Sequence, residues 1–321
     1  MALKILITGA AGDIGTRLTK QLALLVESKE IDLYTTALTE LSYESNSTHG
    51  VFDIRQIEFL EWVSEIKPDV IIHLASIIKL PEGMTEQEAF DIDVKATESL
   101  LKCAVNNSVK KFVVTSSGAA YGYWPDNPEW LTEEHPVRGN DDYFYSRHKK
   151  CVEKLLASYR KDYPQLKQVI LRPGTVLGPN FENPITSMFE KPNIMGIAGA
   201  SSPFVIIWVD DLVQYLVEAA LSNVEGVFNV AGDGTLTLKD IAKRLNKRYI
   251  AVPSCIIKTA LAILKPLGLS QYGPEQVKFI QFRPVLKNQK IKTVFKHQPL
   301  KTTSEAFDAF IEQSEKEYIQ S

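Results

Sequence analysis

The sequence predicts an α/β fold in which a doubly wound parallel sheet is followed by a smaller, mostly helical part. Apolar runs typical of buried strands alternate with helical segments through the first half of the chain, which is the rhythm of a parallel sheet covered on both faces. A glycine-rich turn joins the first strand to the first helix, and after Pro173 the rhythm breaks into loops rich in proline and glycine. We therefore expect a sheet domain over residues 1–173 and a second domain over residues 174–321.

Each expected strand is a short apolar run between turn signals. The expected strands are 3–8, 31–36, 49–53, 69–74, 111–116 and 167–172. In the second domain, helices are expected at 209–222, 237–247, 254–265, 273–282 and 303–317. The domain boundary is soft, because residues 226–231 form a strand-like pattern that could return to the large sheet. Thr302-Thr-Ser-Glu305 is a capping-box signature for the last helix.

The glycine motif Gly9-Ala-Ala-Gly12-Asp-Ile-Gly15 lies between the first strand and a helix expected over 16–26. Glycines at such a turn let the backbone approach a pyrophosphate, whose charge is met by amide groups at the helix N-terminus. The spacing is looser than G-x-G-x-x-G, and a purely structural turn is the alternative. The order of strand, glycines and helix favours a dinucleotide site.

Two further motifs carry candidate chemistry. Tyr145 and Lys149 stand four residues apart, a spacing that puts a phenol and an amine on one helix face but also occurs in solvated surface pairs. Thr115-Ser-Ser117-Gly118 follows the strand over 111–116 and supplies hydroxyls at its C-terminal end. Ligands of open parallel sheets bind at that edge, so the hydroxyl, the phenol and the glycine loop can converge there.

With these motifs the chain resembles the extended short-chain dehydrogenase/reductase family, whose best-known members are nucleotide-sugar epimerases and dehydratases. The resemblance runs almost end to end. Its further matches are Phe52-Asp53-Ile54-Arg55, Val70-Ile-Ile-His73-Leu74-Ala75-Ser76, Leu171-Arg-Pro173-Gly-Thr-Val176-Leu-Gly178-Pro, Trp208-Val-Asp210-Asp211-Leu and Gly226-Val-Phe-Asn229-Val-Ala-Gly232. It implies a Rossmann-type fold, a bound NAD or NADP, and a homodimer formed through the helix that carries Tyr145 and the helix around 93–105.

The resemblance also implies which residues bind and react. The implied cofactor-binding residues are Gly9, Gly12, Asp13, Ile14, Gly15, Thr36, Asp53, Ile54, Leu74, Ala75, Ser76, Tyr145, Lys149, Pro173 and Val176. The implied catalytic residues are Ser117, Tyr145 and Lys149, the substrate contacts are Ser117, Gly118 and Tyr145, and Ser116 is the alternative to Ser117. No metal site is expected, because the three cysteines Cys103, Cys151 and Cys255 lack C-x-x-C spacing.

The expected chemistry is oxidation of a secondary alcohol or the reverse reduction, with Tyr145 as general base or acid. A free phenol has a pKa near 10, so a base at neutral pH needs a downward shift of about 3 units, which the Lys149 ammonium and the positive nicotinamide would supply. Tyr143 and Tyr121 are alternatives for the base. Only Tyr145 is followed by a lysine four residues later.

Departures from the family pattern bear on the cofactor and on the reaction. The second strand ends in Thr35-Thr36 and lacks the acid that binds ribose hydroxyls in NAD-preferring members, yet no basic residue for a 2′-phosphate follows. We expect NAD, with NADP less favoured, also because Asp13 lies in the glycine loop. Gly118 and Ala119 replace the acidic pair of the dehydratases, which argues against sugar dehydration.

The substrate class stays open. Phe204 stands near the position of an arginine that grips the nucleotide diphosphate in epimerases, which favours a smaller or less charged alcohol or ketone. The apolar segment 255–269 resembles the hydroxysteroid-dehydrogenase branch, although an ordinary core helix is the plainer interpretation. A dehydrogenase/reductase leads, an epimerase with tightly bound NAD is the alternative, and a hydroxysteroid-type enzyme or a non-catalytic dinucleotide sensor is less favoured. Asp93 stands where the family commonly has Asn.

The amino-acid composition limits the classes of binding partner that are expected. The chain has 321 residues, 45% of them hydrophobic, and a formal charge of −3, so a small molecule is expected as the partner and nucleic acid is not. The first strand begins at residue 3, and no run approaches the roughly 20 apolar residues that span a bilayer. A cytoplasmic protein without a membrane span is expected. His73, inside an apolar strand, is expected to be a hydrogen-bonded core histidine.

Overall fold

A seven-stranded parallel sheet forms the centre of the computed structural model, which describes residues 2–179, 181, 183–270 and 273–320. The strand order is β10-β6-β5-β4-β1-β2-β3. The strands are β1 (Leu3–Thr8), β2 (Ile31–Ala37), β3 (Thr48–Val51), β4 (Val70–His73), β5 (Lys111–Thr115), β6 (Lys167–Pro173) and β10 (Gly226–Val230). The predicted doubly wound α/β fold and its six strands are confirmed, and β10 pairs with β6, so residues 226–230 lie in the large sheet.

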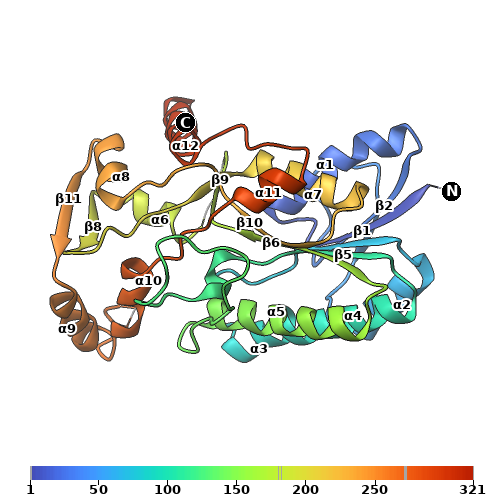
Figure 1. The fold of residues 1–321 in the computed structure, drawn as a ribbon, viewed down its shortest axis with the longest axis horizontal. Coiled ribbons are helices and arrows are strands. Elements are labelled where there is room, and N and C mark those ends of the chain that lie inside the picture. Colours follow the sequence, from blue (N-terminus) through green and yellow to red (C-terminus); the bar gives the residue numbers. More distant parts are fainter. Residues whose placement is uncertain (1, 180, 182, 271–272, 321) are drawn as a thin grey trace.

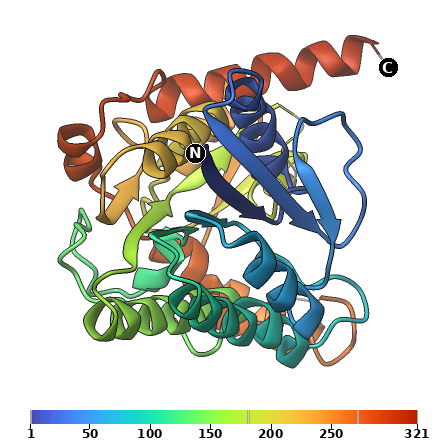
Figure 2. The same cartoon turned by 90° about the vertical axis from the view of Figure 1, so that its right-hand side faces the viewer.

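Helices cover both faces of this sheet (Figures 1 and 2). One layer contains α1 (Asp13–Glu27) and α7 (Val209–Leu221), and the other contains α2 (Ile57–Ile66), α4 (Ala96–Asn106) and α5 (Phe144–Asp162). Alternation along β1 explains the two layers, because Ile5 and Ile7 join the cluster under α1 and α7 whereas Leu6 joins the cluster under α2, α4 and α5. All three side chains are fully buried.

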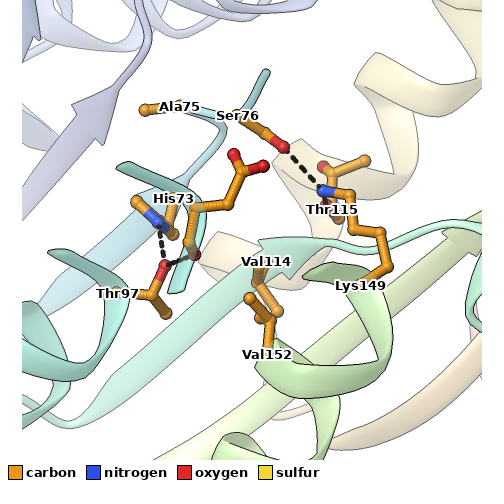
Figure 3. A pocket seen from close by; sticks show the side chains of 9 residues that line it. His73, Ala75, Ser76, Thr97, Val114, Thr115, Lys149 and Val152 are labelled. Atoms are coloured by element: carbon orange, nitrogen blue, oxygen red, sulfur yellow. Dashed lines mark hydrogen bonds between the residues drawn. The ribbon is translucent and has the colours of Figure 1, made fainter. Parts of the chain in front are cut away.

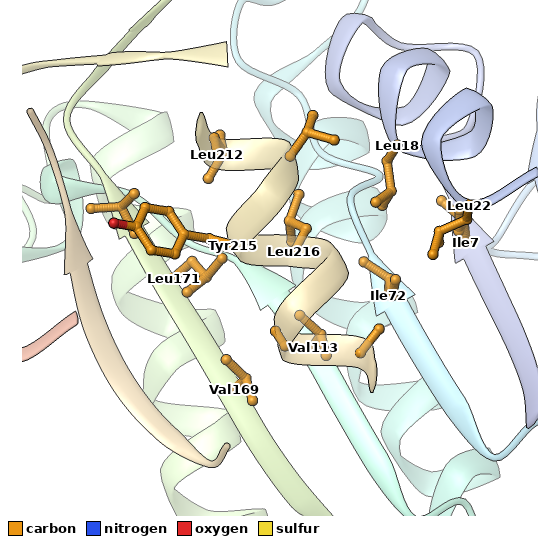
Figure 4. Close-up of a cluster of buried hydrophobic side chains, with 14 of the residues drawn as sticks. Ile7, Leu18, Leu22, Ile72, Val113, Val169, Leu171, Leu212, Tyr215 and Leu216 are labelled. Atoms are coloured by element: carbon orange, nitrogen blue, oxygen red, sulfur yellow. The ribbon is translucent and has the colours of Figure 1, made fainter. Parts of the chain in front are cut away.

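The hydrophobic cluster between the sheet and the layer of α1 and α7 is drawn in Figure 4. Leu18 and Leu22 of α1 are four residues apart, and with Leu212 and Leu216 of α7 they face strand residues such as Ile72. Such i, i+4 spacing puts apolar side chains on one helix face. The glycine loop follows β1 directly and leads into α1, so both of its ends are fixed by this packed layer.

Short elements connect the sheet and build the second part of the chain. On the side of α4 and α5 these are α3 (Glu86–Phe90), the π-helical η1 (Asp91–Lys95) and the 3₁₀ turn η2 (Gly118–Tyr121). Beyond β6 lie β7 (Thr175–Leu177), α6 (Thr186–Phe189), β8 (Asn193–Ile197), β9 (Ile206–Trp208), α8 (Leu238–Arg244), β11 (Arg248–Val252), α9 (Ser254–Leu264), η3 (Pro274–Gln276), α10 (Val277–Gln281), α11 (Gln289–Val294) and α12 (Thr303–Gln320). β7 pairs with β9, and β8 pairs with β11. The sheet edge, β7 and loops of this second part line the cleft described below.

Helix α9 differs from the ordinary core helix expected from its sequence. None of its residues is buried, and Ile256 and Ile263 are 57% and 56% exposed. It lies at the end of the molecule formed by β8 and β11 (Figure 1). Among the described elements, α9 has its main contacts with η3 and α10, so an apolar sequence here does not imply burial.

Within the part of the chain that the structure describes, no helix combines the length and the apolar character needed to cross a membrane.

The layer of α7 yields a stability prediction. Leu216 is fully buried and packs in the cluster of Figure 4, so Leu216→Ala is expected to lower the free energy of unfolding by about 2–5 kcal/mol through lost burial and a residual cavity. Urea denaturation measures the change. Leu221→Ala on the same helix, where Leu221 is 42% exposed, is the matched control and should shift stability by less than about 0.5 kcal/mol. Equal effects of the two changes would contradict the packing described here.

Candidate active site

The glycine loop between β1 and α1 is tight enough to require glycine at two positions. Gly9 has φ +74°, and a Cβ there would lie 2.7 Å from the amide nitrogen of Ala75. A Cβ on Gly15 would lie 2.2 Å from the carbonyl oxygen of Gly9. Gly12 precedes the first turn of α1, which begins at Asp13 and presents helix N-terminal amides. Loop and helix terminus thus form a cradle suited to an anionic group.

Tyr145 and Lys149 lie in the first turns of α5, beside the loop that carries Ser117. The hydroxyl of Ser146 donates to the carbonyl of Ala119 at 2.6 Å and accepts from the amide of Asn140 at 2.9 Å, which fastens the start of α5 to η2. Ser117 caps η2, its Oγ accepting from the amide of Ala119 at 3.1 Å. The serine, phenol and amine are therefore held by adjoining elements.

Contacts within this group place the ammonium of Lys149 deep in the site. Its Nζ lies 5.5 Å from the centroid of the Tyr145 ring and donates to Ser76 Oγ at 3.0 Å and to the Thr115 carbonyl at 3.2 Å. Figure 3 shows this arrangement, with Lys149 reaching Ser76 and Thr115 from α5. Ser117 hydrogen-bonds the phenol of Tyr145.

The electrostatics of the isolated polypeptide oppose ionisation of Tyr145. Burial raises the pKa of this phenol to about 12, the hydrogen bond with Ser117 opposes the rise, and the charge of Asp93 adds to it. Burial lowers the pKa of Lys149, while Asp93 and Glu153 act to raise it. The downward shift expected for the phenol from Lys149 is therefore not produced by the protein alone, because loss of solvation outweighs it.

One continuous cleft joins these groups to the glycine loop. It has a volume of about 340 Å³ and is lined by Gly9, Gly12, Asp13, Ile14, Gly15, Leu74, Ser76, Ser117, Gly118, Tyr145, Lys149, Pro173 and Val176 among the predicted site residues. A volume of this size matches small-molecule sites. The C-terminal ends of β1, β4, β5 and β6 all open into it, at the point where the strand order reverses around β1.

Four predicted cofactor-binding residues lie outside the cleft lining. Thr36 and Ile54 are buried in the protein, and Ala75 lines a small separate cavity. Asp53 is held by Arg55, whose Nε lies 3.0 Å from both carboxylate oxygens, and this hydrogen bonding lowers the pKa of Asp53. Their assignment to the cofactor stays a prediction.

Ser116, the alternative to Ser117, belongs instead to a buried polar network. Its hydroxyl donates to Glu153 Oε1 at 2.6 Å, and Glu153 accepts from Arg172 Nε at 2.8 Å. Arg172 also donates to the Tyr121 hydroxyl at 2.6 Å, and that hydroxyl donates to Asn229 at 2.8 Å. The network includes the Tyr121 hydroxyl as well, so both alternative residues already have hydrogen-bond partners inside the protein.

His73 is satisfied as expected. Its ring nitrogens lie 2.7 Å from Thr8 Oγ1 and 2.9 Å from Thr97 Oγ1, and burial lowers its pKa to about 4 (Figure 3).

The sequence analysis missed Arg283, which lines the cleft more than a hundred residues downstream of Tyr145. Its guanidinium lies 3.8 Å from the centroid of the Phe204 ring and 3.3 Å from Thr175 Oγ1, and burial lowers its pKa. The Arg283 cation thus lies over Phe204, the residue that the sequence analysis placed near the position of a phosphate-binding arginine. No local motif marks Arg283, because it reaches the cleft only through the packing of the segment after α10.

A Rossmann-type sheet with a glycine turn, a serine and a Tyr-x-x-x-Lys pair on one cleft is typical of dinucleotide-binding oxidoreductases. The chain belongs to the NAD dependent epimerase/dehydratase family, whose model matches residues 5–231.

Proteins similar to this chain in sequence or in structure are consistent with membership of this family. A UDP-glucose 4-epimerase of Mycolicibacterium smegmatis is 30% identical over 236 residues, which cover 68% of this chain and 73% of that protein. An uncharacterized protein of Mycobacterium tuberculosis is 22% identical over 310 residues, covering 95% of this chain and 82% of that protein. The crystal structure of a UDP-glucose 4-epimerase from Thermotoga maritima, with UDP-glucose, superposes with a TM-score of 0.74 at 19% identity and covers 98% of this chain and all (100%) of that one. At that identity the last likeness concerns the fold.

The buried ion pair beneath the site yields a prediction. Glu153 and Arg172 are 4% and 5% exposed. Arg172→Met leaves the buried Glu153 carboxylate without its cation, so it is expected to lower the free energy of unfolding by about 3–5 kcal/mol. The double variant with Glu153→Met should recover most of the loss, as measured by urea denaturation. Lys167→Met, which breaks an exposed pair with Glu225, is the control and should change stability by less than about 1 kcal/mol. Additive losses in the double variant would contradict the coupling.

Proposed function

We propose that the protein is an NAD-dependent oxidoreductase that interconverts a secondary alcohol and a ketone, with Tyr145 as the general acid or base. The observation that carries this proposal is a single cleft lined by the glycine loop, Ser117, Tyr145 and Lys149. A dinucleotide and a small substrate need such adjacent subsites, one for the pyrophosphate and one for the reacting carbon.

The described residues fit a dinucleotide. Gly9 and Gly15 let the loop pack closely against backbone that a Cβ would strike, and the N-terminus of α1 adjoins this tight loop to receive a pyrophosphate. Lys149, on the cleft wall, would hold the nicotinamide ribose by family resemblance. Residues 37–47 contain two glutamates and no lysine or arginine, which supports NAD over NADP because a 2′-phosphate calls for a cation.

The reaction needs a hydride transfer at carbon and a proton transfer at oxygen, and different groups would perform these two transfers. When bound, the nicotinamide supplies a C4 carbon that gives or accepts a hydride. Ser117 would hydrogen-bond the substrate oxygen, and Tyr145 would give that oxygen a proton as a ketone is reduced or remove one as an alcohol is oxidised. Each direction moves one hydride at carbon and one proton at oxygen, so the balance closes without a metal or another reactant.

Acid–base behaviour favours reduction at neutral pH. Because burial raises the pKa of Tyr145 to about 12, the phenol carries the proton that ketone reduction consumes. Oxidation needs the phenolate and should therefore increase as the pH rises toward that pKa. The positive charge of the oxidised nicotinamide would move this dependence to lower pH.

Replacement of the phenol tests the assignment. Tyr145→Phe is expected to reduce turnover by about 100- to 10,000-fold, since a positioned acid or base is lost, while dinucleotide affinity stays close to that of the wild type. Steady-state kinetics on a panel of alcohols and ketones, together with fluorescence titration of NADH, measure the two quantities. Tyr143→Phe in the same cleft is the control and should keep most of the activity. Wild-type turnover in Tyr145→Phe would refute the role.

A nucleotide-sugar epimerase is the second candidate, favoured by Arg283. Its half-buried guanidinium lines the cleft, and its hydrogen bond among the described residues, to Thr175 at 3.3 Å, is long, so it can still pair with a phosphate. Relatives named UDP-glucose 4-epimerase belong to the same family. An epimerase keeps NAD bound and returns the hydride to the opposite face of the sugar.

Retained dinucleotide separates the two candidates. Protein purified without added cofactor and then denatured is expected to release well below one equivalent of NAD, measured by mass spectrometry, because a dehydrogenase exchanges its cofactor. Near-stoichiometric NAD would favour the epimerase. In that case Arg283→Met should raise the KM for UDP-glucose by about 10- to 100-fold, the effect of losing a charged hydrogen bond, and leave the KM for neutral ketones unchanged.

We further propose that the protein is cytoplasmic and forms a homodimer through α4 and α5. The two helices lie side by side on one face of the sheet (Figure 1). Cys103, Cys151 and Cys255 are all unpaired, which fits a reducing compartment.

A further inference from the structure

A second buried polar pair lies behind Lys149 and differs from the Glu153–Arg172 pair. Asp93, in the π-helical turn η1, and His148, in α5 next to Lys149, are 4% and 0% exposed. Asp93 Oδ2 lies 2.8 Å from His148 Nδ1, and Asp93 Oδ1 accepts from the amide of Ile77 at 2.8 Å. The π-helical turn is itself a feature that recurs at functional sites.

The imidazole of His148 is confined. Its ring packs edge-on against Phe90 and Phe144, with centroids 5.3 and 5.4 Å away. Its Nε2 is buried and has no hydrogen-bond partner within the described residues. The hydrogen bond between Nδ1 and Asp93 is therefore the polar contact that holds this ring among the described residues.

The described hydrogen-bond partners of Asp93 are an imidazole and a backbone amide. Glu153, the other buried carboxylate near Lys149, is paired with the guanidinium of Arg172. Asp93 and Lys149 instead line one small cavity of about 10 Å³, together with His73, Ser76 and Thr97. That space holds about one water molecule, so the carboxylate and the ammonium border the same confined space.

The groups facing Lys149 come from three elements. Asp93 faces it from η1, Tyr145 and Glu153 from α5, and His73 from β4. His73 has a pKa lowered to about 4 and is neutral at ordinary pH. Of the two carboxylates in this set, Glu153 is paired with Arg172 and Asp93 is held by His148 and a backbone amide. Asp93 acts both to raise the pKa of Lys149 and to raise that of Tyr145.

We propose that Asp93 is a positioning residue whose buried carboxylate, oriented by His148, supports the charge of the Lys149 ammonium and biases the site toward ketone reduction. The direction of bias rests on the proposed function, but the effect on Lys149 does not. A carboxylate here stabilises the ammonium and disfavours the phenolate, and a protonated phenol is the form that reduction needs. His148 acts through Asp93 and touches neither substrate nor cofactor in this scheme.

The direct test is Asp93→Asn in the full-length protein. The asparagine removes the charge. Its Oδ1 can still accept from Ile77, and its NH₂ can donate to Nδ1 of His148 in the tautomer that carries the proton on Nε2. We expect the midpoint of the Lys149 titration, followed by NMR of ¹³C-labelled lysine and assigned with Lys149→Met, to fall by about one pH unit. Asp91→Asn, two residues away on the same turn but paired with Lys95 at the surface, is the matched control and should leave the midpoint unchanged.

Kinetics supply the second readout. Asp93→Asn is expected to lower the ratio of ketone reduction to alcohol oxidation at pH 7.5 by up to about tenfold, and to move the pH profile of oxidation to lower pH, since one pKa unit is a tenfold change in ionisation. A merely structural role would depress both directions and leave the profile in place. If Asp93→Asn does not fold, as judged by circular dichroism, Asp93→Ser removes the same charge with less bulk.

The outcomes are distinguishable. An unchanged Lys149 midpoint in a folded Asp93 variant overturns the inference, whatever the activity. A lowered midpoint supports the role of Asp93 at Lys149. A lowered midpoint with an unchanged direction ratio overturns the bias toward reduction. Absence of turnover by the wild type on every alcohol and ketone tested overturns the proposed function instead, because the titration requires no substrate.

Discussion

The buried ion pair between Glu153 and Arg172 is the constraint on which the site depends. Glu153 belongs to α5, one turn beyond Lys149, and Arg172 lies at the end of β6. Through Ser116 the same carboxylate holds the end of β5. Helix, strand ends and serine loop are thus fixed to one another inside the protein, where a pair with full hydrogen bonding is maintained and a broken one is heavily penalised. The positions of Ser117, Tyr145 and Lys149 follow from this anchoring.

Charge balance around Lys149 is the second organising feature. Burial works against its ammonium, and two carboxylates work in favour of it. One of them is neutralised by Arg172, whereas Asp93 is held by an imidazole and a backbone amide. For Tyr145, burial and the nearby negative charge act in the same direction: both raise the pKa of the phenol and keep it protonated. The acid–base character of the site therefore reflects the whole cluster.

Local sequence predicted much of the fold and most of the candidate site residues that line the cleft. Strand positions followed from apolar runs, and the alternation of Ile5, Leu6 and Ile7 between two clusters shows why such runs mark strands buried on both faces. Gly9, Ser117 and Tyr145 stand at ends of elements on one sheet edge, so local pattern and topology sufficed to group them. The burial of α9 was predicted wrongly, because apolar composition does not say whether a partner surface exists.

The sequence by itself determined the βα rhythm, the glycine turn and the Tyr-x-x-x-Lys spacing, since each depends on residues close together in the chain. Only the tertiary structure decided that the Ser116 hydroxyl binds Glu153, that Arg283 lies over Phe204, and that Asp93 meets His148 behind Lys149. Those contacts join segments 37 to 79 residues apart. Desolvation and pairing of charge arise where such segments meet, so no local pattern encodes them.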